Sequence, residues 1–455
     1  MKKMFIVALA AMLCVFIAMP AAAEVQIHGM IWVDAYMRDI NADATTVNTN
    51  SYSSAIPSIP GKATLDPTHS YYGGWSSKTY GDVKDTQVTM PYSQNYLNFV
   101  YFNKAGNLGA NFTICGGSVN DFANWNQMNT GANIWFKPSK ALHIRLGKID
   151  QFIGGLYPGV SLANAEYYRM LSDPADSDAF DSYMHAGPNT MQVPASITFG
   201  NLHSTSKLGI DFAYTLSKAM TLKVALFDPD VDGTAGNYLN TTGTTAAGKR
   251  GVIEDSTLPR VDVAVPMRFG PVYAQPKVSW VRQSLQNMTA GSEDEFDVWL
   301  AGVDASVTFG PITLAGEYVY AENIGGSNHT GGLSTQGPRA YLDGTVYKIA
   351  TEENSLWWVE LGWAISPKLV AKASYGVHNM ECDNSPSTVL DDVEFERSHI
   401  GVSVRYALHP NCFIQPQWLR QDFGEAKLGV GQSLGILKVD MGQVDYYGVS
   451  VYLMF

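Results

Sequence analysis

The sequence has few of the long apolar runs that cross a bilayer as helices. An uncharged apolar stretch occurs at Met4–Met19, and no later stretch approaches the ~18 uninterrupted apolar residues that a spanning helix needs. Met4–Met19 follows the basic segment Met1–Lys3 and precedes Pro20-Ala-Ala-Ala23. This combination is typical of a secretory signal peptide with an Ala-x-Ala cleavage site. We therefore predict that residues 1–23 are a signal peptide and that residues 24–455 form the mature chain.

Cysteine and positive charge are also scarce. Of the four cysteines, Cys14 lies in the predicted signal peptide, so an odd number remains and no disulfide framework can be read. Charged residues make up only 16% of the chain, and the formal net charge of −12 becomes −14 once the two charges of Lys2 and Lys3 are removed. Such acidity argues against a nucleic-acid partner. The nine histidines show no metal-ligand spacing and no Cys-x-x-Cys-His motif occurs, so the chain is not itself a cytochrome.

What the sequence does contain is alternation of apolar and polar residues, most clearly at the C-terminus. Counting back from Phe455, every second residue is apolar or aromatic: Leu453, Val451, Val449 and Tyr447. The residues between them are more polar, and a period of two places each set on one face of a strand. An apolar outer face, a mixed inner face and a C-terminal aromatic residue are typical of a strand in an outer-membrane barrel.

The same alternation recurs along the mature chain and predicts sixteen strands, of which the first is 25–37. They are joined alternately by long polar loops and by short turns that carry Pro, Gly, Asn or Ser, as turns do. The predicted turns lie at 104–107, 138–141, 216–219, 269–271, 309–311, 366–368 and 409–411. The longest loops are 38–92 and 150–204, and no linker divides the chain into two domains.

This arrangement predicts the fold class. Short turns on one side and long loops on the other are typical of outer-membrane barrels, and an even strand count returns both termini to the periplasmic side. We therefore expect an all-β protein, a 16-stranded antiparallel transmembrane β-barrel with short periplasmic turns and long extracellular loops, formed by residues 24–455 as one domain.

The charged residues of the predicted strands fall on one face. Val303 alternates with Asp304, and Val402 with Ser403 and Arg405. A Lys or Arg facing lipid at mid-depth would cost about 2–4 kcal/mol. A soluble β-sandwich would show the same alternation with its faces reversed, apolar inside and charged outside. The signal peptide, the terminal aromatic residue and the regular exchange of short and long connections favour the barrel.

Three prolines do not fit the pattern easily. Pro266, Pro276 and Pro416 fall inside predicted strands, where each removes a hydrogen-bond donor from the ladder. We expect β-bulges near the periplasmic rim at these positions.

Over essentially its whole mature length, the chain resembles the general-diffusion porins of Gram-negative outer membranes. The matching features are the ending Tyr447–Phe455, the sixteen strands, and the segment Arg145–Asp150, which looks like the basic strand end from which such porins send their third loop into the lumen. The resemblance implies the outer membrane as location, contact with its lipid and, usually, a homotrimer. A Pro-Glu-Phe-Gly loop tip, as in enteric porins, is missing.

Barrel size and charge predict the pore. About sixteen strands leave an aqueous channel, whereas about eight are filled by their own side chains. Loop 150–204 is long enough to fold inward as a constriction, and its acidic run is Asp173, Asp176, Asp178 and Asp181. The bases expected to face the lumen are Arg145, Lys223, Arg260, Arg268 and Lys277. Opposed charges of this kind select solutes by charge and radius. Alternatively, the acidic run simply solvates an extracellular loop. Net acidity favours a mild cation preference, which the lumen bases oppose.

Two further motifs have weaker implications. Asp228, Asp230 and Asp232 match the first half of a calcium loop, but Leu239 stands where the bidentate Glu belongs. The segment is therefore either a weak calcium site or an acidic loop start, and we expect no cofactor besides weakly bound calcium. Gly431–Gly435 matches the G-x-S-x-G pattern but lacks the strand–turn–helix context that this nucleophile motif requires.

Three functions are compatible with a barrel of this kind. The first is a porin that admits small hydrophilic solutes or ions by passive diffusion. The second is a sheath around a multihaem cytochrome in an electron conduit, which requires an unobstructed lumen. The third is a barrel enzyme, which needs a Ser/His or Asp/His group that cannot be assembled here. We predict a porin that is not an enzyme, and the sequence does not identify its solute.

Overall fold

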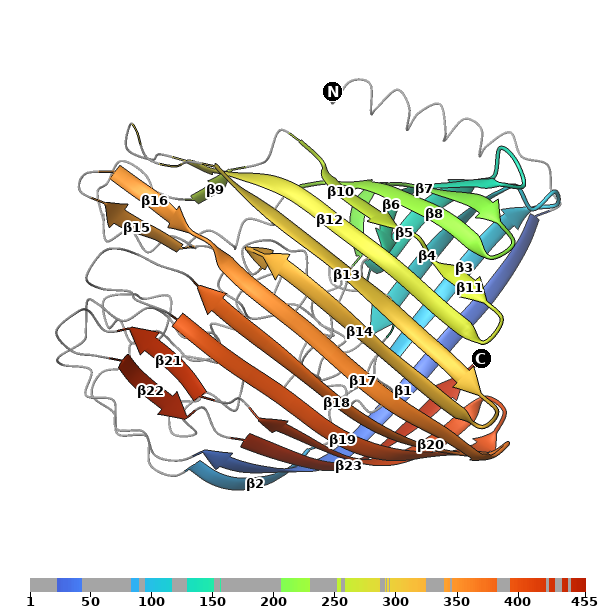
Figure 1. The fold of residues 1–455 in the computed structure, drawn as a ribbon. Coiled ribbons are helices and arrows are strands. Elements are labelled where there is room, and N and C mark those ends of the chain that lie inside the picture. Colours follow the sequence, from blue (N-terminus) through green and yellow to red (C-terminus); the bar gives the residue numbers. More distant parts are fainter. Residues whose placement is uncertain are drawn as a thin grey trace.

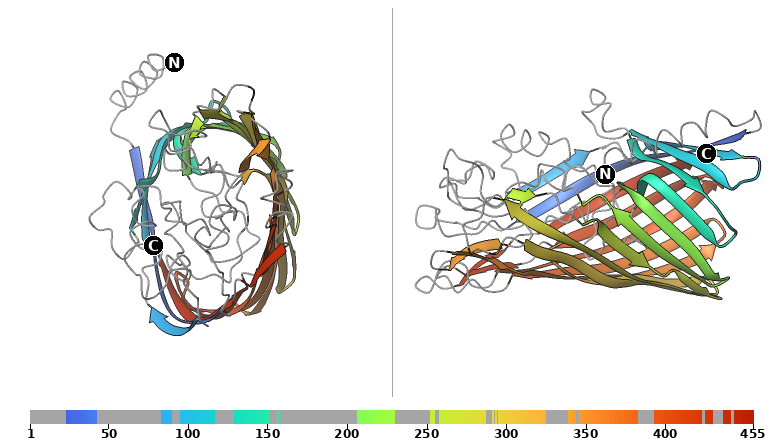
Figure 2. Two further views of the ribbon diagram at one scale, coloured as in Figure 1. Left: turned by 90° about the vertical axis from the view of Figure 1, so that its left-hand side faces the viewer. Right: turned by 90° about the horizontal axis from the view of Figure 1, so that it is seen from above.

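The computed structural model shows one closed wall of antiparallel strands (Figures 1 and 2). It describes residues 23–42, 83–89, 95–116, 129–150, 156, 206–229, 252–254, 258–286, 291, 293, 295–324, 339–343, 346–382, 393–422, 425–429, 436–440 and 443–455. The ring has sixteen strand positions, as predicted. The described part of the chain contains no helix long and apolar enough to span a membrane.

The wall runs through the chain in order. One of its sixteen positions is shared by β10 and β11, and the strands are β1 (Ala23–Ala42), β3 (Asn95–Asn103), β4 (Leu108–Gly116), β5 (Asn129–Phe136), β6 (Leu142–Asp150), β7 (Ser206–Ser217), β8 (Met220–Phe227), β10 (Arg260–Ala264), β11 (Met267–Phe269), β12 (Val272–Gln286), β13 (Glu295–Phe309), β14 (Ile312–Glu322), β17 (Glu352–Ser366), β18 (Leu369–Cys382), β19 (Val393–His409), β20 (Cys412–Asp422) and β23 (Gln443–Met454).

The first and last strands close the ring. The N-terminal part of β1 pairs with β3, and Met30–Asn41 pair with β23. The left view of Figure 2, along the barrel axis, shows the wall as a continuous ring of tilted strands. A closed barrel leaves no unpaired sheet edge, so the backbone donors and acceptors of the wall are satisfied between strands, as a lipid environment demands.

The short connections all lie at one end of the barrel, on the right in Figure 1. They join β3–β4, β5–β6, β7–β8, β11–β12, β13–β14, β17–β18 and β19–β20, which are the connections predicted as turns. In the two Phe-Gly-Pro turns, Gly270 and Gly310 have φ values of +58° and +56°, a left-handed conformation that glycine adopts at little cost. By the asymmetry common to such barrels, this end is periplasmic.

The predicted loops contain more strand than expected. The first strand runs to Ala42 rather than residue 37, and short strands occur in four predicted loops: β2 (Val83–Thr89), β9 (Val252–Glu254), the hairpin β15 (Arg339–Asp343) with β16 (Val346–Ala350), and the hairpin β21 (Glu425–Gly429) with β22 (Ile436–Asp440). These segments lie beyond the apolar belt, where no lipid face requires apolar residues at every second position. The alternation used to find strands is therefore weak in them.

The bulges expected at the prolines were mostly a wrong prediction. Pro276 stands opposite Val303 and Pro416 opposite Val449, and both of these pairings continue without a change of register. Only Pro266 interrupts its strand, dividing β10 from β11. Its carbonyl accepts a hydrogen bond from the Thr221 amide at 3.1 Å. The barrel absorbs a missing donor by leaving single positions unpaired rather than by shifting a strand.

Candidate functional site

The two faces of the wall differ in polarity in the direction that the sequence predicts. Val303, Val402 and Val451 are 39%, 46% and 38% exposed on the outer surface. Asp304, next to Val303, is fully buried on the inner face. The other buried polar side chains of the inner face include Asp211, Arg260, Asp262, Gln275, Lys277, Ser279, Glu317, Glu360, Gln415, Gln417 and Ser450. Apolar groups therefore cover the outer surface, while the inner face carries the buried charged and polar groups together with buried apolar residues such as Val298 and Leu300.

Two of the predicted pore-wall bases make bidentate ion pairs with neighbouring carboxylates. Arg145 on β6 binds Asp211 on β7, its Nε lying 2.8 Å from Oδ2. Arg260 binds Asp262, with Nε and Nη2 each 2.8 Å from a carboxylate oxygen, and its Nε lies 3.0 Å from the Ser279 hydroxyl. The two pairs fix these side chains against the wall.

Lys277 is the centre of a larger buried cluster on β12, β13 and β14. Its Nζ donates to Asp304 Oδ1 at 3.1 Å and to Glu317, and all three side chains are shielded from solvent. Trp358 Nε1 donates to the other Glu317 oxygen at 3.0 Å. The amide of Gln275 lies 3.4 Å from Asp304 Oδ2. Two carboxylates around one ammonium leave the cluster with a formal negative charge, which its amide and indole donors help to stabilise.

Asp304 also receives a donor from a distant part of the chain. The backbone N–H of Leu156 lies 3.4 Å from Asp304 Oδ1. Leu156 follows β6 by only a few residues, whereas β13 is separated from β6 in the ring by β7, β8, β10 and β12. Because Asp304 faces the lumen, Leu156 lies inside the barrel at the inner surface of β13.

The remaining predicted bases lie on the inner face as well. Lys223 stands on β8 opposite Ala213 of β7. Arg268 on β11 stands opposite Tyr273, and its guanidinium carbon lies 5.9 Å from the centre of that ring. All five predicted bases are therefore on inward-facing strand positions, but the structure does not gather them into one cluster.

The sequence did not reveal which carboxylates these bases bind. Asp211 and Glu317 were not singled out from the sequence, although both occupy polar positions of alternating strands. Asp211 lies between Ile210 and Phe212, and Glu317 lies beside Tyr318. Asp304 was predicted to lie on the polar face of its strand, without a partner, and Asp262 and Glu360 occupy polar positions of the same kind. The alternation could have found all five as lumen residues, and it also places Asp262 two positions from Arg260 on the same face of β10. The partners on different strands follow only from the register between strands.

Other predicted site residues lie outside the described part of the chain. These are Asp173, Asp176, Asp178 and Asp181 of the acidic run, and Asp230 and Asp232 of the calcium motif. Asp228 is described, and its backbone N–H donates to the Leu208 carbonyl at 2.8 Å. Within the described ranges, no group of three or more His, Cys, Asp or Glu side chains is placed to hold a metal ion.

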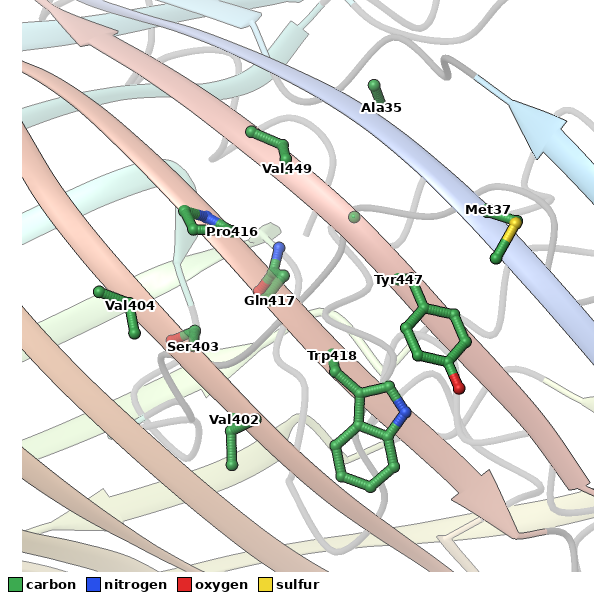
Figure 3. A pocket seen from close by; sticks show the side chains of 11 residues that line it. Ala35, Met37, Val402, Ser403, Val404, Pro416, Gln417, Trp418, Tyr447 and Val449 are labelled. Carbon is green, nitrogen blue, oxygen red and sulfur yellow. The ribbon is translucent and has the colours of Figure 1, made fainter.

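A groove of about 660 Å³ lies on the wall at β1, β19, β20 and β23 (Figure 3). Its lining includes Val402, Val449, Trp418 and Tyr447, and none of its lining residues is charged. Val402, Val449 and Tyr447 are exposed on the outer surface, so this groove is part of the lipid-facing side rather than of the pore.

Comparisons with known proteins agree with this geometry. Residues 8–414 match the model of a family described as Gram-negative porin. The fold is similar to that of the outer membrane channel DcaP of Acinetobacter baumannii, with a TM-score of 0.54, 12% identity, and coverage of 96% of this chain and 99% of that one. It is also similar to an anion-selective porin from Comamonas acidovorans, with a TM-score of 0.52, 10% identity, and coverage of 95% and 100%. At these identities the likeness shows the fold alone. No curated protein sequence matches the chain.

Proposed function

Because this chain belongs to the Gram-negative porin family and forms an outer-membrane channel for passive diffusion, we propose that segment 150–204 narrows its pore. Family and fold are those of channel proteins rather than of enzymes. A narrowed pore would sort small hydrophilic solutes by size and charge. A barrel of about sixteen strands is wide enough for a water column, so an element inside it has to set the limit of size and charge.

The hydrogen bond from Leu156 to Asp304 carries this proposal. It supports a path in which the segment leaves β6, turns into the lumen and passes the inner wall at β13. The Lys277 cluster gives the segment a rigid partner, because Asp304 is itself held by Lys277 and Gln275.

We further propose that the acidic run Asp173 to Asp181 lies in this constriction. Inward-facing Arg145, Lys223 and Arg260 would then face carboxylates across the narrowest part of the channel. Such an arrangement favours polar solutes that can align with the transverse field, and it rejects large or apolar ones.

The assembled state is proposed from the family. We propose a homotrimer embedded in outer-membrane lipid, in which each chain forms its own channel. The alternative function, a sheath around a multihaem cytochrome, requires an open lumen. The position of Leu156 on the inner wall argues against it.

Planar-bilayer recording of the purified full-length protein tests both the channel function and the proposed constriction by segment 150–204. Stepwise channel openings are expected, and their absence would remove the channel function. Replacing residues 158–203 with a short Gly-Ser linker should raise the single-channel conductance at least about twofold, because the narrowest part of the pore sets its resistance. The matched control shortens the loop 231–250, which is expected to leave conductance unchanged. Equal conductance of wild type and the first variant would reject the constriction.

A further inference from the structure

The periplasmic end of the barrel is basic although the chain as a whole is acidic. The turns carry lysines, and all of these lysines are exposed: Lys104, Lys137, Lys140, Lys218 and Lys368. The carboxylates at this end are Glu24, at the start of β1, and the terminal group of Phe455. This end therefore differs in sign from the net charge of −12 of the whole chain.

Three cations at this end face the pore and rest on aromatic rings. Lys137 Nζ lies 4.9 Å from the centre of the Trp135 ring, Arg268 lies 5.9 Å from that of Tyr273, and Arg405 lies 5.1 Å from that of Phe413. The rings belong to the inner face. Trp135 pairs with inward-facing Arg145, and Tyr273 pairs with inward-facing Ser306. Phe413 lies two residues before Gln415, so both side chains are on the same inner face of β20.

The three cations lie on different sides of the ring, beside β5, β11 and β19 (Figure 1). We name Lys137, Arg268 and Arg405 the periplasmic collar. A cation over an aromatic face keeps its full charge while its side chain is held in place. The collar is therefore a fixed set of positive charges around one mouth of the channel.

The carboxylates deeper in the described wall cancel little of this charge, because each accepts from a base and only the Lys277 cluster, with two carboxylates to one ammonium, keeps a formal negative charge. Asp211 binds Arg145, Asp262 binds Arg260, Asp304 and Glu317 bind Lys277, and Glu360 accepts from Lys372 Nζ at 2.8 Å. Among the described carboxylates of the inner face, Glu24 is the one nearest the periplasmic mouth, and it accepts from the Gln26 amide at 3.0 Å. Two carboxylates, that of Glu24 and that of the Phe455 terminus, stand against the three cations and the exposed turn lysines, so the mouth remains positive.

We propose that the periplasmic collar concentrates small anions at that mouth and makes the channel rectify. This inference rests on the proposed channel function and adds the charge class of the solute that the periplasmic entrance prefers. Charged rings at a pore mouth raise the local concentration of counter-ions. Anions that a voltage drives from the periplasmic mouth into the pore start from the raised anion concentration at the collar. Current is therefore larger when the periplasmic side is negative than when the voltage is reversed.

Single-channel recording in potassium chloride tests this. At about 0.1 M salt, where the Debye length is about 10 Å, the ratio of currents at equal voltages of opposite sign should exceed about 1.5. At about 1 M, with a Debye length near 3 Å, the ratio should fall towards one. The direction in which a channel inserts changes only the sign of the asymmetry, so the ratio can be read from each channel separately.

The decisive variant is Lys137→Gln/Arg268→Gln/Arg405→Gln. It should lose the asymmetry at low salt and shift its reversal potential in a salt gradient towards that of a cation-preferring pore. The matched control Lys104→Gln/Lys140→Gln/Lys218→Gln removes the same number of charges from turn tips and should keep most of the asymmetry.

Barrel folding of each variant is checked by its strand signal in circular dichroism and by heat-dependent gel migration. Open channels with equal current ratios in wild type and collar variant would overturn the collar and leave the channel function intact. Absence of any channel opening in the wild type would instead remove the channel function itself. A variant that does not fold is replaced by the single substitutions, each of which should lower the ratio in part.

Discussion

The ring of Phe455 covers Gly29, and the two residues exchange backbone hydrogen bonds. The Gly29 amide donates to the Phe455 carbonyl at 2.7 Å, and the Phe455 amide donates to the Gly29 carbonyl at 3.0 Å. A Cβ at position 29 would overlap the phenylalanine ring. Gly29 is the buried position on a β1 face where Val25 and Ile27 are exposed. The last residue of the chain therefore fills the gap that a glycine leaves beside the closing seam.

We predict an energetic coupling between these two residues. Gly29→Ala should displace the Phe455 ring and destabilise the folded barrel by about 1 kcal/mol. Phe455→Ala should also destabilise the barrel, because the packing of the ring is lost. In the Phe455→Ala background, Gly29→Ala should cost less, because no ring remains to be displaced. The measurement is the free energy of unfolding in denaturant for both single variants and the double variant in lipid vesicles. Strictly additive losses would show that the ring and the glycine do not act together.

The inside-out wall predicts a strong difference between neighbouring positions on β13. Ala305 faces outward and Ser306 inward, at nearly the same depth. Ala305→Arg should destabilise the barrel in vesicles by about 2 kcal/mol, since the guanidinium would meet lipid, while Ser306→Arg should cost less than about 1 kcal/mol. Both variants add the same side chain, so their difference reports the environment. Equal losses for Ala305→Arg and Ser306→Arg in vesicles would contradict a lipid-facing position for Ala305.

Sequence reasoning predicted the faces of the strands because lipid constrains them one residue at a time. Val303 and Asp304 could be assigned to opposite sides from alternation alone, and the turns from their Gly and Pro residues. The hairpin β15–β16 could not be found, because a strand that projects beyond the bilayer need not alternate.

The partners across strands were also beyond sequence reasoning. The pair of Arg145 and Asp211 joins residues 66 positions apart, and that of Lys277 and Glu317 joins residues 40 apart. Each depends on the register of neighbouring strands, and a shift of one residue would turn one partner to the lipid. The register follows from turn geometry and closure of the whole ring rather than from any local pattern. The five lumen bases were therefore predictable as inward-facing, but the carboxylate partners of Arg145 and Lys277 on other strands were not.

The stability of the Lys277 cluster depends on its charge balance. Lys277→Met would leave Asp304 and Glu317 buried beside one another without their cation, and should destabilise the barrel by about 3–5 kcal/mol. Neutralising the whole cluster, as Lys277→Met/Asp304→Asn/Glu317→Gln, should recover most of that loss, because no buried charge remains. Lys372→Met is the matched control: Lys372 and Glu360 are 21% and 7% exposed, so the water that reaches this pair should keep its loss smaller. Unfolding in denaturant, measured in vesicles at neutral pH, gives each value. If Lys277→Met cost no more than Lys372→Met, or if the triple variant were the least stable, the stability of this part of the wall would come from packing and not from the pairing of charges.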